Sequence, residues 1–195
     1  FSELDMVLFV IDAKKPDVVD FEGYLFPDTY FFAVDAGAQN IAKIMLDNMA
    51  EHVSDLGTPK GDAAGMSIHE VLTLASIVER EVRQPSTMKN VADIFLKRLE
   101  IGMALQADST VNYVIDGDDP SISFEDRDNT DSPYNTYKYP GLPPGPISAP
   151  SENAIDAVLN PTHNEYYYFL TTDDGEIYYA ETNEEHVNNK NRYLK

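Results

Sequence analysis

The stretch Ser67–Arg83, SIHEVLTLASIVEREVR, is the one around which the predicted fold is organised. Ser67 is followed three residues later by Glu70, which is the capping-box pattern of a helix start. Apolar residues then recur at helical spacing and, at about 100° per residue, form one broad arc. They are Ile68, Val71, Leu72, Leu74, Ala75, Val78 and Val82. The stretch therefore predicts an amphipathic helix with one buried face.

Glu79 departs from this pattern. It lies one turn after Ala75, so its side chain projects from the buried face, whereas Arg80 lies on the opposite side. Desolvation raises the pKa of a buried carboxyl group, which is how an enzyme obtains a proton donor near neutral pH. Two structural explanations compete: Glu79 pairs with Arg83 four residues on, or it caps a neighbouring loop. The helical pattern alone leaves all three open.

The composition indicates a folded, acidic protein. Of 195 residues, 43% are hydrophobic, which suits one domain with a real core, or one domain plus a remnant of another. A net charge of −20 argues against nucleic acid as a partner, since phosphate neutralisation requires clustered Lys and Arg, and against adsorption to anionic membranes. The absence of cysteine excludes disulfides and thiolate sites. A neutral or cationic ligand, or a polymer held by hydrogen bonds and stacking, fits better.

Residues 1–20 are expected to be the tail of a preceding module and its linker, with the main domain at 21–195. The sequence contains neither an apolar run of roughly 18 residues, as a membrane span requires, nor a signal peptide. The abrupt start at Phe1 suggests a piece of a longer protein, so a missing anchor says nothing about the parent.

Helices and one hairpin are predicted along the rest of the chain, which makes the expected fold class α+β. Pro85 and Ser86 are expected to separate the Glu79 helix from the next one. The further helices are expected at Ala36–Leu56, at Thr87–Ile101, after Asp108, at Ser151–Leu159 with Ser151 as its cap, and at Asn183–Tyr193. Tyr166–Thr172 and Glu176–Ala180 form the hairpin, across Asp173-Asp174-Gly175.

Two loops and an aromatic stretch have functional alternatives. Residues 116–131 are acidic and predict a solvated loop, since they lack the regular oxygen-ligand spacing of a calcium-binding loop. The Pro-rich loop, residues 132–150, is rigid and suits a binding cleft, although a surface turn would explain it equally. The aromatic stretch Phe21–Phe32 is more typical of a core than of sugar stacking, and Glu22 within it is a candidate functional carboxylate. Asp108 is a candidate helix N-cap.

Six stretches occur in an order that resembles the YceG-like family of endolytic murein transglycosylases (MltG type), over about Phe21–His186. They are EGYLFPDTY, LASIVERE, FLKRLEIGMALQADSTVNY, SPYNTY, GLPPGPISAP and YYAETNEEH. The resemblance implies that Glu79 is the catalytic glutamate. It also implies that seven residues line or support the cleft: Glu22, Glu81, Gln106, Asp108, Tyr134, Asn135 and Thr136. Residues 116–131 do not align with the family pattern.

The resemblance further implies a mechanism and a setting. Protonated Glu79 would donate to the glycosidic oxygen between N-acetylmuramic acid and N-acetylglucosamine, and the resulting carboxylate would remove the proton of the muramic C6 hydroxyl, closing a 1,6-anhydro ring. No metal or other cofactor is needed. Members typically have an amino-terminal membrane anchor and a LysM-like module, so the expected location is the extracytoplasmic face of the bacterial plasma membrane. Peptidoglycan glycan strands are the implied partner, with cell-wall synthases as further candidates.

Two other functions compete with this one. A muramidase-type hydrolase would combine Glu79 with a second carboxylate, from Glu22, Glu81 or Asp108, and would release reducing ends. A non-enzymatic glycan-binding module would use the aromatic residues and the Pro-rich loop alone.

Overall fold

The structure is a computed structural model that describes residues 15–16, 20–57, 63, 65–115, 122–172 and 174–194. Its helices are α2 (Ala38–Leu56), α3 (Ile68–Glu81), α4 (Pro85–Glu100), α5 (Asp108–Ile115), α6 (Phe124–Asn129), α7 (Glu152–Leu159) and α8 (Asn183–Tyr193). Strands β1 (Tyr168–Thr171) and β2 (Ile177–Ala180) pair antiparallel. The predicted α+β class is confirmed, and no described helix is long and apolar enough to cross a membrane.

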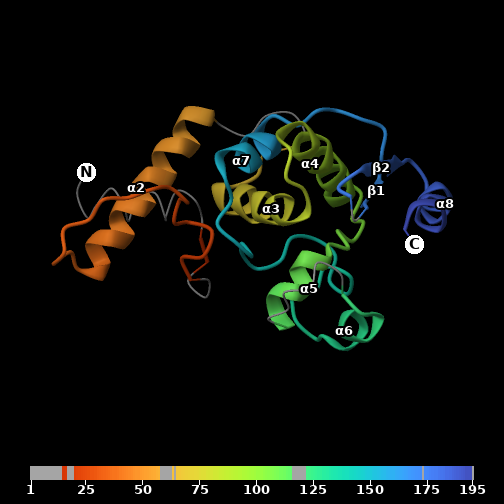
Figure 1. Ribbon diagram of the computed structural model, residues 1–195, viewed down its shortest axis with the longest axis horizontal. Coiled ribbons are helices and arrows are strands. Elements are labelled where there is room, and N and C mark those ends of the chain that lie inside the picture. Colours follow the sequence, from red (N-terminus) through yellow and green to blue (C-terminus); the bar gives the residue numbers. More distant parts are fainter. Residues whose placement is uncertain are drawn as a thin grey trace.

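Helix α3 is the centre of the fold. It packs against α4, α7 and α5, and Figure 1 shows it between α7 on one side and α5 on the other. Every residue from Val71 to Val78 is buried, the polar Thr73 and Ser76 included. The predicted single buried face is therefore wrong, because partners cover the middle of α3 all round. Because α3 is held by its neighbours, its last turn, which carries Glu79, has a fixed position.

The two ends of α3 follow from local chemistry. The predicted capping box is confirmed: the Ser67 hydroxyl accepts from the Glu70 N–H, and the Glu70 carboxylate accepts from the Ser67 N–H at 2.7 Å. The helix ends at Glu81, because Val82 is extended. Helix α4 begins at Pro85, two residues earlier than expected. Proline is favoured at the first helical position, where its missing N–H has no intrahelical partner to lose.

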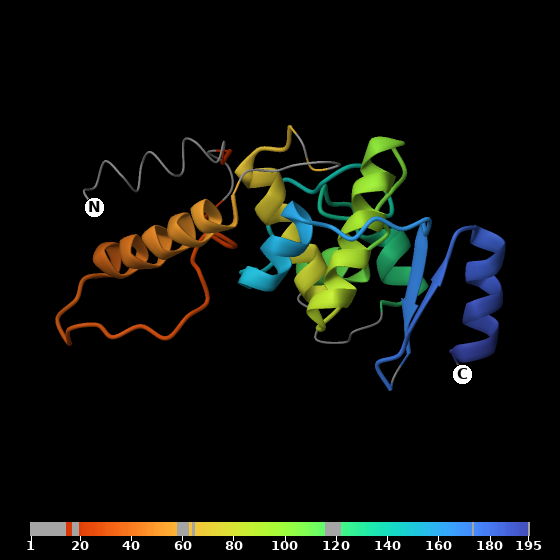
Figure 2. The same cartoon turned by 90° about the horizontal axis from the view of Figure 1, so that it is seen from above.

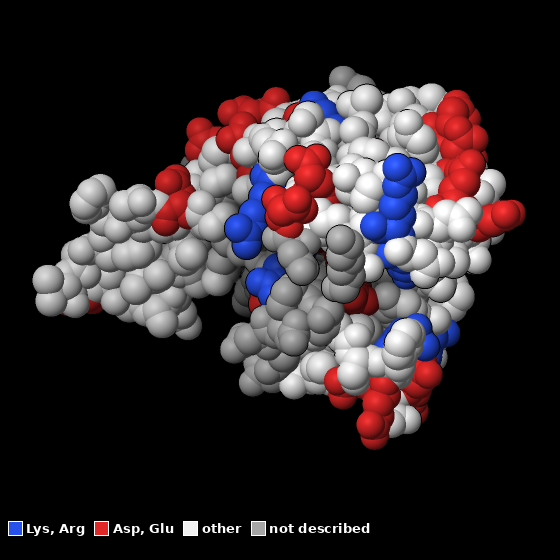
Figure 3. Space-filling view, turned by 45° about the vertical axis from the view of Figure 1, so that its right-hand side comes forward, with Lys and Arg blue, Asp and Glu red and all other residues white. Residues whose placement is uncertain are grey.

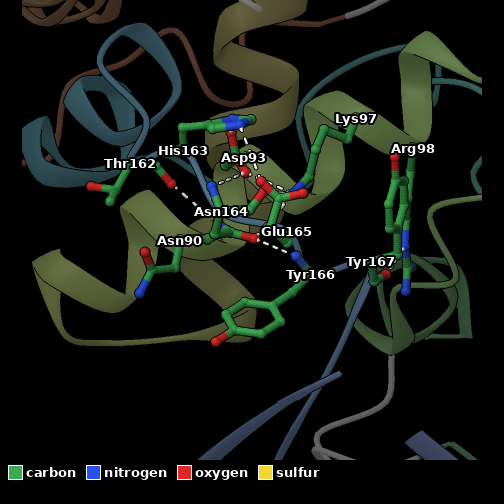
Figure 4. Close-up of polar contacts among 10 residues, drawn as sticks. All are labelled: Asn90, Asp93, Lys97, Arg98, Thr162, His163, Asn164, Glu165, Tyr166 and Tyr167. Atoms are coloured by element: carbon green, nitrogen blue, oxygen red, sulfur yellow. Dashed lines mark hydrogen bonds and ion pairs between the residues drawn. The ribbon is translucent and has the colours of Figure 1, made fainter. Parts of the chain in front are cut away.

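A buried ion pair fastens α4 to the segment between α7 and β1 (Figure 4). Asp93 is fully buried, and its Oδ2 lies 2.9 Å from Lys97 Nζ and accepts the Asn164 N–H at 3.0 Å. Lys97 also donates to the backbone and side-chain oxygens of Asn164. Both charged residues lie in α4, and their hydrogen bonds to Asn164 fix the path of the chain into the hairpin. Breaking this buried pair would leave an uncompensated charge, which is costly.

The hairpin and α8 form one end of the molecule, opposite α2 (Figure 2). Tyr168 pairs with Ala180 in the register, and Phe169 packs edge-on against Phe95 of α4, with ring centroids 5.8 Å apart. Tyr178 stacks on Tyr193 of α8 at 3.7 Å. Helix α8 has the predicted bounds, and β1 and β2 lie within the two segments predicted for the hairpin.

Two expectations about loops are corrected. Residues 124–129 of the acidic segment form the short helix α6, because the Ser123 hydroxyl caps it by accepting the Asp126 N–H at 3.0 Å. None of the residues of α6 is buried, so this described part of the segment is solvated as expected. The aromatic stretch is divided: Tyr24 and Phe26 are buried, whereas Phe31 is 96% exposed. The expected tail at 1–20 and residues 116–121 lie almost entirely outside the described residues.

Candidate active site

Glu79 lies in the last turn of α3 and faces the N-terminus of α7. Its Oε2 accepts two hydrogen bonds from Ser151, one from the N–H at 3.0 Å and one from the hydroxyl at 2.5 Å. Capping of a neighbouring segment is thus one role of Glu79, whereas Arg83 makes no described ion pair with it. The side chain is partly buried, less than the helical arc predicts. Its Oε1 has no hydrogen-bond partner among the described residues and can exchange a proton with a ligand.

The Pro-rich loop reaches Glu79 along the surface of α3. His69, in the first turn of the helix, has its Nε2 2.9 Å from the Pro144 carbonyl oxygen. Further along, the buried Ser76 hydroxyl accepts the Ile147 N–H at 3.0 Å, and the Ser148 hydroxyl donates to the Ser76 carbonyl at 3.3 Å. Two polar residues of α3 therefore hold the loop, and the chain arrives at α7 beside Glu79. The predicted lack of helix and strand in this loop is confirmed.

Glu81 points to the other side of α3. Two residues along a helix correspond to a rotation of about 200°, and Glu81 accordingly contacts α5 instead of α7. Its Oε1 accepts the Ser109 hydroxyl at 2.7 Å and the Ser109 N–H at 3.4 Å. Burial raises the pKa of the Glu81 carboxyl, and the negative charge of Asp108 raises it further, while the Ser109 hydrogen bonds oppose the shift. Desolvation therefore favours the protonated form of Glu81.

Asp108 and Gln106 lie at the start of α5. Asp108 is the first residue of the helix, and its Oδ1 accepts the Tyr137 hydroxyl at 2.5 Å, so the carboxylate links α5 to the Pro-rich loop. Gln106 has a φ of 53°, and it is the one described residue other than glycine with a positive φ. Such strain of about 1–3 kcal/mol persists where surrounding contacts fix the backbone. The Gln106 side chain is exposed and has no described partner.

Asn135 and Thr136 supply the contacts that fix this backbone. Both are fully buried. The Asn135 amide donates to two carbonyl oxygens, those of Arg127 and Thr130, at 2.8 and 2.9 Å. The Thr136 carbonyl accepts the Gln106 N–H at 3.2 Å. The Asn135 side chain thus holds the loop to the end of α6, and the Thr136 hydroxyl, which accepts the Ala107 N–H at 3.1 Å, holds it to the start of α5. Both side chains are covered from solvent, so any role in a cleft is that of support.

Glu22, Tyr113 and Tyr134 form a third group. The Tyr113 hydroxyl donates to Glu22 Oε2 at 3.0 Å, and the rings of Tyr113 and Tyr134 lie 5.0 Å apart. Glu22 is exposed, and Tyr113 is about one-third exposed, so an aromatic face and a carboxylate are both accessible here. Next to Glu22, Gly23 abuts Pro146, and this contact joins the group to the Pro-rich loop.

The structure therefore places the sequence-predicted residues in separate groups. Glu79 lies on the α7 side of α3 and Glu81 on its α5 side, and no described contact joins Glu79 to the other predicted residues. Reasoning from sequence missed Tyr113 and the contact that Ser151 makes with Glu79. Ser151 was expected only as the cap of its own helix, and its contact with Glu79 joins positions 72 residues apart. On the described part of the face in Figure 3, acidic and basic side chains lie in separate small groups. Among the described residues, no cluster of three or more His, Asp and Glu could hold a metal ion.

Comparison with known proteins gives a consistent result. The model of the YceG-like family matches residues 4–192. The chain is 34% identical over 209 aligned positions to an endolytic murein transglycosylase of Bacillus subtilis, covering 99% of this chain and 57% of the relative. It is 35% identical to an endolytic murein transglycosylase of Streptococcus pneumoniae, over 86% of this chain and 31% of the relative. The chain therefore spans between about a third and just over half the length of these relatives.

A crystal structure of a YceG-like protein from Listeria monocytogenes superposes with a TM-score of 0.78 at 34% identity, covering 94% of this chain and 62% of that one. The similarity therefore extends from the order of the motifs to the arrangement of the helices and the hairpin. Because the family model matches nearly the whole chain, the chain belongs to the YceG-like family.

Proposed function

We propose that this chain is the catalytic part of a lytic transglycosylase that cleaves peptidoglycan glycan strands internally, between N-acetylmuramic acid and N-acetylglucosamine. The observation that carries the proposal is the similarity to two relatives named endolytic murein transglycosylase, over 99% and 86% of this chain. It is supported by the position of Glu79, a partly exposed carboxylate with one oxygen free, on a helix fixed from all sides.

Glu79 acts first as a general acid and then as a general base. In the first step, its proton passes to the glycosidic oxygen as the bond from that oxygen to C1 of the muramic residue breaks. In the second step, the C6 hydroxyl oxygen bonds to C1 and its proton returns to Glu79. The enzyme is regenerated, no water is consumed, and the product carries a 1,6-anhydro end. General acid–base catalysis of this kind contributes typically about 10²–10⁴-fold to the rate.

The remaining polar groups position the glycan. The exposed Gln106 amide can both donate and accept hydrogen bonds, which suits sugar hydroxyl and acetamido groups. Tyr113 and Tyr134 offer aromatic faces, with Glu22 as a nearby acceptor. Asn135 and Thr136 act indirectly, by fixing the backbone of the loop and of Gln106.

A hydrolase with two carboxylates is the rival mechanism. Its two carboxyl groups must flank the same glycosidic bond. Glu81 is the candidate whose pKa is raised, but its carboxyl contacts Ser109 of α5, whereas Glu79 contacts Ser151 at α7. This opposite orientation argues against Glu81 as the second carboxylate of such a hydrolase.

A Glu79→Gln variant tests the assignment. Glutamine keeps the size and accepts the Ser151 hydrogen bonds, but it cannot transfer a proton. We expect the variant to co-sediment with insoluble peptidoglycan as the unaltered protein does, while the release of soluble fragments falls by at least about 10²-fold. Undiminished release would remove Glu79 from the mechanism. Binding without release by both proteins would favour the glycan-binding module.

We also propose the setting of the domain. Residues 21–195 form the catalytic domain, and residues 1–20 belong to a preceding module. The full-length parent is held on the extracytoplasmic face of the plasma membrane by one amino-terminal anchor, where cell-wall synthases are candidate partners. The test is protease treatment of intact spheroplasts that carry the full-length protein: cleavage of this domain is expected, and complete protection would contradict the location.

A further inference from the structure

Ser151 holds Glu79 in one orientation. Two donors of a single residue, its N–H and its hydroxyl, converge on the same atom, Oε2, at 3.0 and 2.5 Å. The other oxygen, Oε1, has no described partner. We propose that Ser151 is a positioning residue for Glu79, which saturates Oε2 so that Oε1 is the oxygen that exchanges protons with the glycan. This inference rests on the proposed catalytic role of Glu79.

The two donors select between chemically equivalent oxygens. A protonated carboxyl group has one oxygen that carries the proton and one that only accepts hydrogen bonds. Because Oε2 already faces two donors, a proton on Oε2 would compete with them, whereas a proton on Oε1 would not. The same contacts persist when the group is a carboxylate. Oε1 therefore gives up the proton in the first step and receives one in the second, and Ser151 exchanges no proton.

Ser151 can perform this task because its own position is fixed on both sides. It is the N-cap of α7, and its Oγ accepts the Ala154 N–H at 3.4 Å while its hydroxyl proton goes to Glu79. Before it, the Pro-rich loop is bonded to Ser76, which lies one turn before Glu79 on the same helix. Glu79 and the loop that carries Ser151 are thus both attached to the same helix, α3. This pre-arrangement lowers the cost of reaching the reactive geometry.

A cap alone would explain the bond between Ser151 and the Ala154 N–H, so the experiment must separate capping from positioning. Threonine and glycine are about equally good N-caps, and only threonine retains the hydroxyl. The matched pair is therefore Ser151→Thr and Ser151→Gly, assayed on soluble glycan strands. The loss of one hydrogen bond to a charged group predicts a kcat roughly tenfold lower for Ser151→Gly, with KM unchanged, and a kcat within about threefold of the original for Ser151→Thr.

Two controls complete the test. Thr182→Gly removes the N-cap hydroxyl of α8, which accepts the Glu185 N–H, and should leave kcat unchanged. Glu79→Gln should abolish turnover. If Ser151→Gly and Ser151→Thr have the same kcat while Glu79→Gln is inactive, Ser151 is only a helix cap and the inference is overturned. If Glu79→Gln keeps its activity, the proposed catalytic role of Glu79 is wrong, and the positioning role of Ser151 is wrong as well.

Discussion

Replacing Gly23 by alanine should weaken the fold and the candidate site together. Gly23 has a φ of 78°, and an added Cβ would lie 2.2 Å from Pro146 Cβ and 2.5 Å from Pro146 Cγ. Ordinary carbon contacts are about 3.5–4.0 Å. A side chain at Gly23 therefore pushes on the Pro-rich loop beside the two residues that bond to Ser76, Ile147 and Ser148.

The magnitude is the sum of two costs. A left-handed backbone costs an ordinary residue about 1–2 kcal/mol relative to glycine. Overpacking a filled site adds about 1–3 kcal/mol. Gly23→Ala should thus lower the free energy of unfolding by about 2–5 kcal/mol. At about 2–4 °C per kcal/mol for a protein of this size, the melting temperature should fall by roughly 4–20 °C.

Gly102→Ala is the matched control. Gly102 has a φ of 68°, but an added Cβ there meets no atom within 4 Å. Only the backbone cost remains, so the expected loss is about 1–2 kcal/mol, or roughly 2–8 °C, which is smaller than that for Gly23→Ala at the same slope. Thermal unfolding by circular dichroism measures both, and glycan cleavage well below either transition should fall for Gly23→Ala alone. Equal melting temperatures for the two variants, or full activity of Gly23→Ala, would refute the reasoning.

Three further predictions concern buried charges. Burial lowers the pKa of His186 from 6.5 to about 4. Between these two pH values the unfolded state binds a proton that the folded state does not, so the protein loses stability as the pH falls from 6.5 toward 4. His186→Gln should remove about 1–2 kcal/mol of this acid sensitivity in urea unfolding, allowing for the residue's partial exposure, and an unchanged pH dependence would contradict it. Burial raises the pKa of Glu81 above 4.5 in the folded state, so the folded protein loses stability as the pH rises through that raised pKa. Glu81→Gln should therefore raise the free energy of unfolding at pH 7 and change it little at pH 4. A lower free energy of unfolding at pH 7 would contradict the direction of the pKa shift. Asp93→Asn leaves Lys97 buried without its counter-ion and should lower the free energy of unfolding, measured with denaturant, by about 3–5 kcal/mol. Asp128→Asn, at the exposed pair with Arg127, should change it little. Similar losses for the two variants would contradict the role of burial.

Local signals predicted much of the fold. The capping box at Ser67 and the apolar spacing after it identified α3, and the Ser151 cap identified α7. The turn sequence before Glu176 located the hairpin, and α8 was predicted with its observed bounds. Such signals depend on residues a few positions apart, so they can be recognised from the sequence.

Packing between distant segments could not be predicted in this way. The burial of α3 on all sides depends on where α4, α5 and α7 lie, and periodicity describes only one face. The start of α4 at Pro85 was missed because proline breaks a helix interior but suits its first position.

The same limit applies to the candidate site. Glu79 was identified because a carboxylate interrupts an apolar arc, but neither its contact with Ser151 nor the contact of Glu81 with Ser109 is visible in that pattern. Asn135 and Thr136 are polar residues in a Pro-rich loop, which the sequence cannot distinguish from groups that touch a ligand. Their complete burial assigns them to support of the loop.

The most direct test of the central claim is mass spectrometry of the soluble products released from purified peptidoglycan by this protein and by its Glu79→Gln variant. We expect 1,6-anhydro-muramyl ends, one water lighter than the corresponding reducing ends, and we expect them to disappear with the variant. Reducing ends would contradict non-hydrolytic cleavage, and anhydro ends that persist with Glu79→Gln would contradict the role of Glu79.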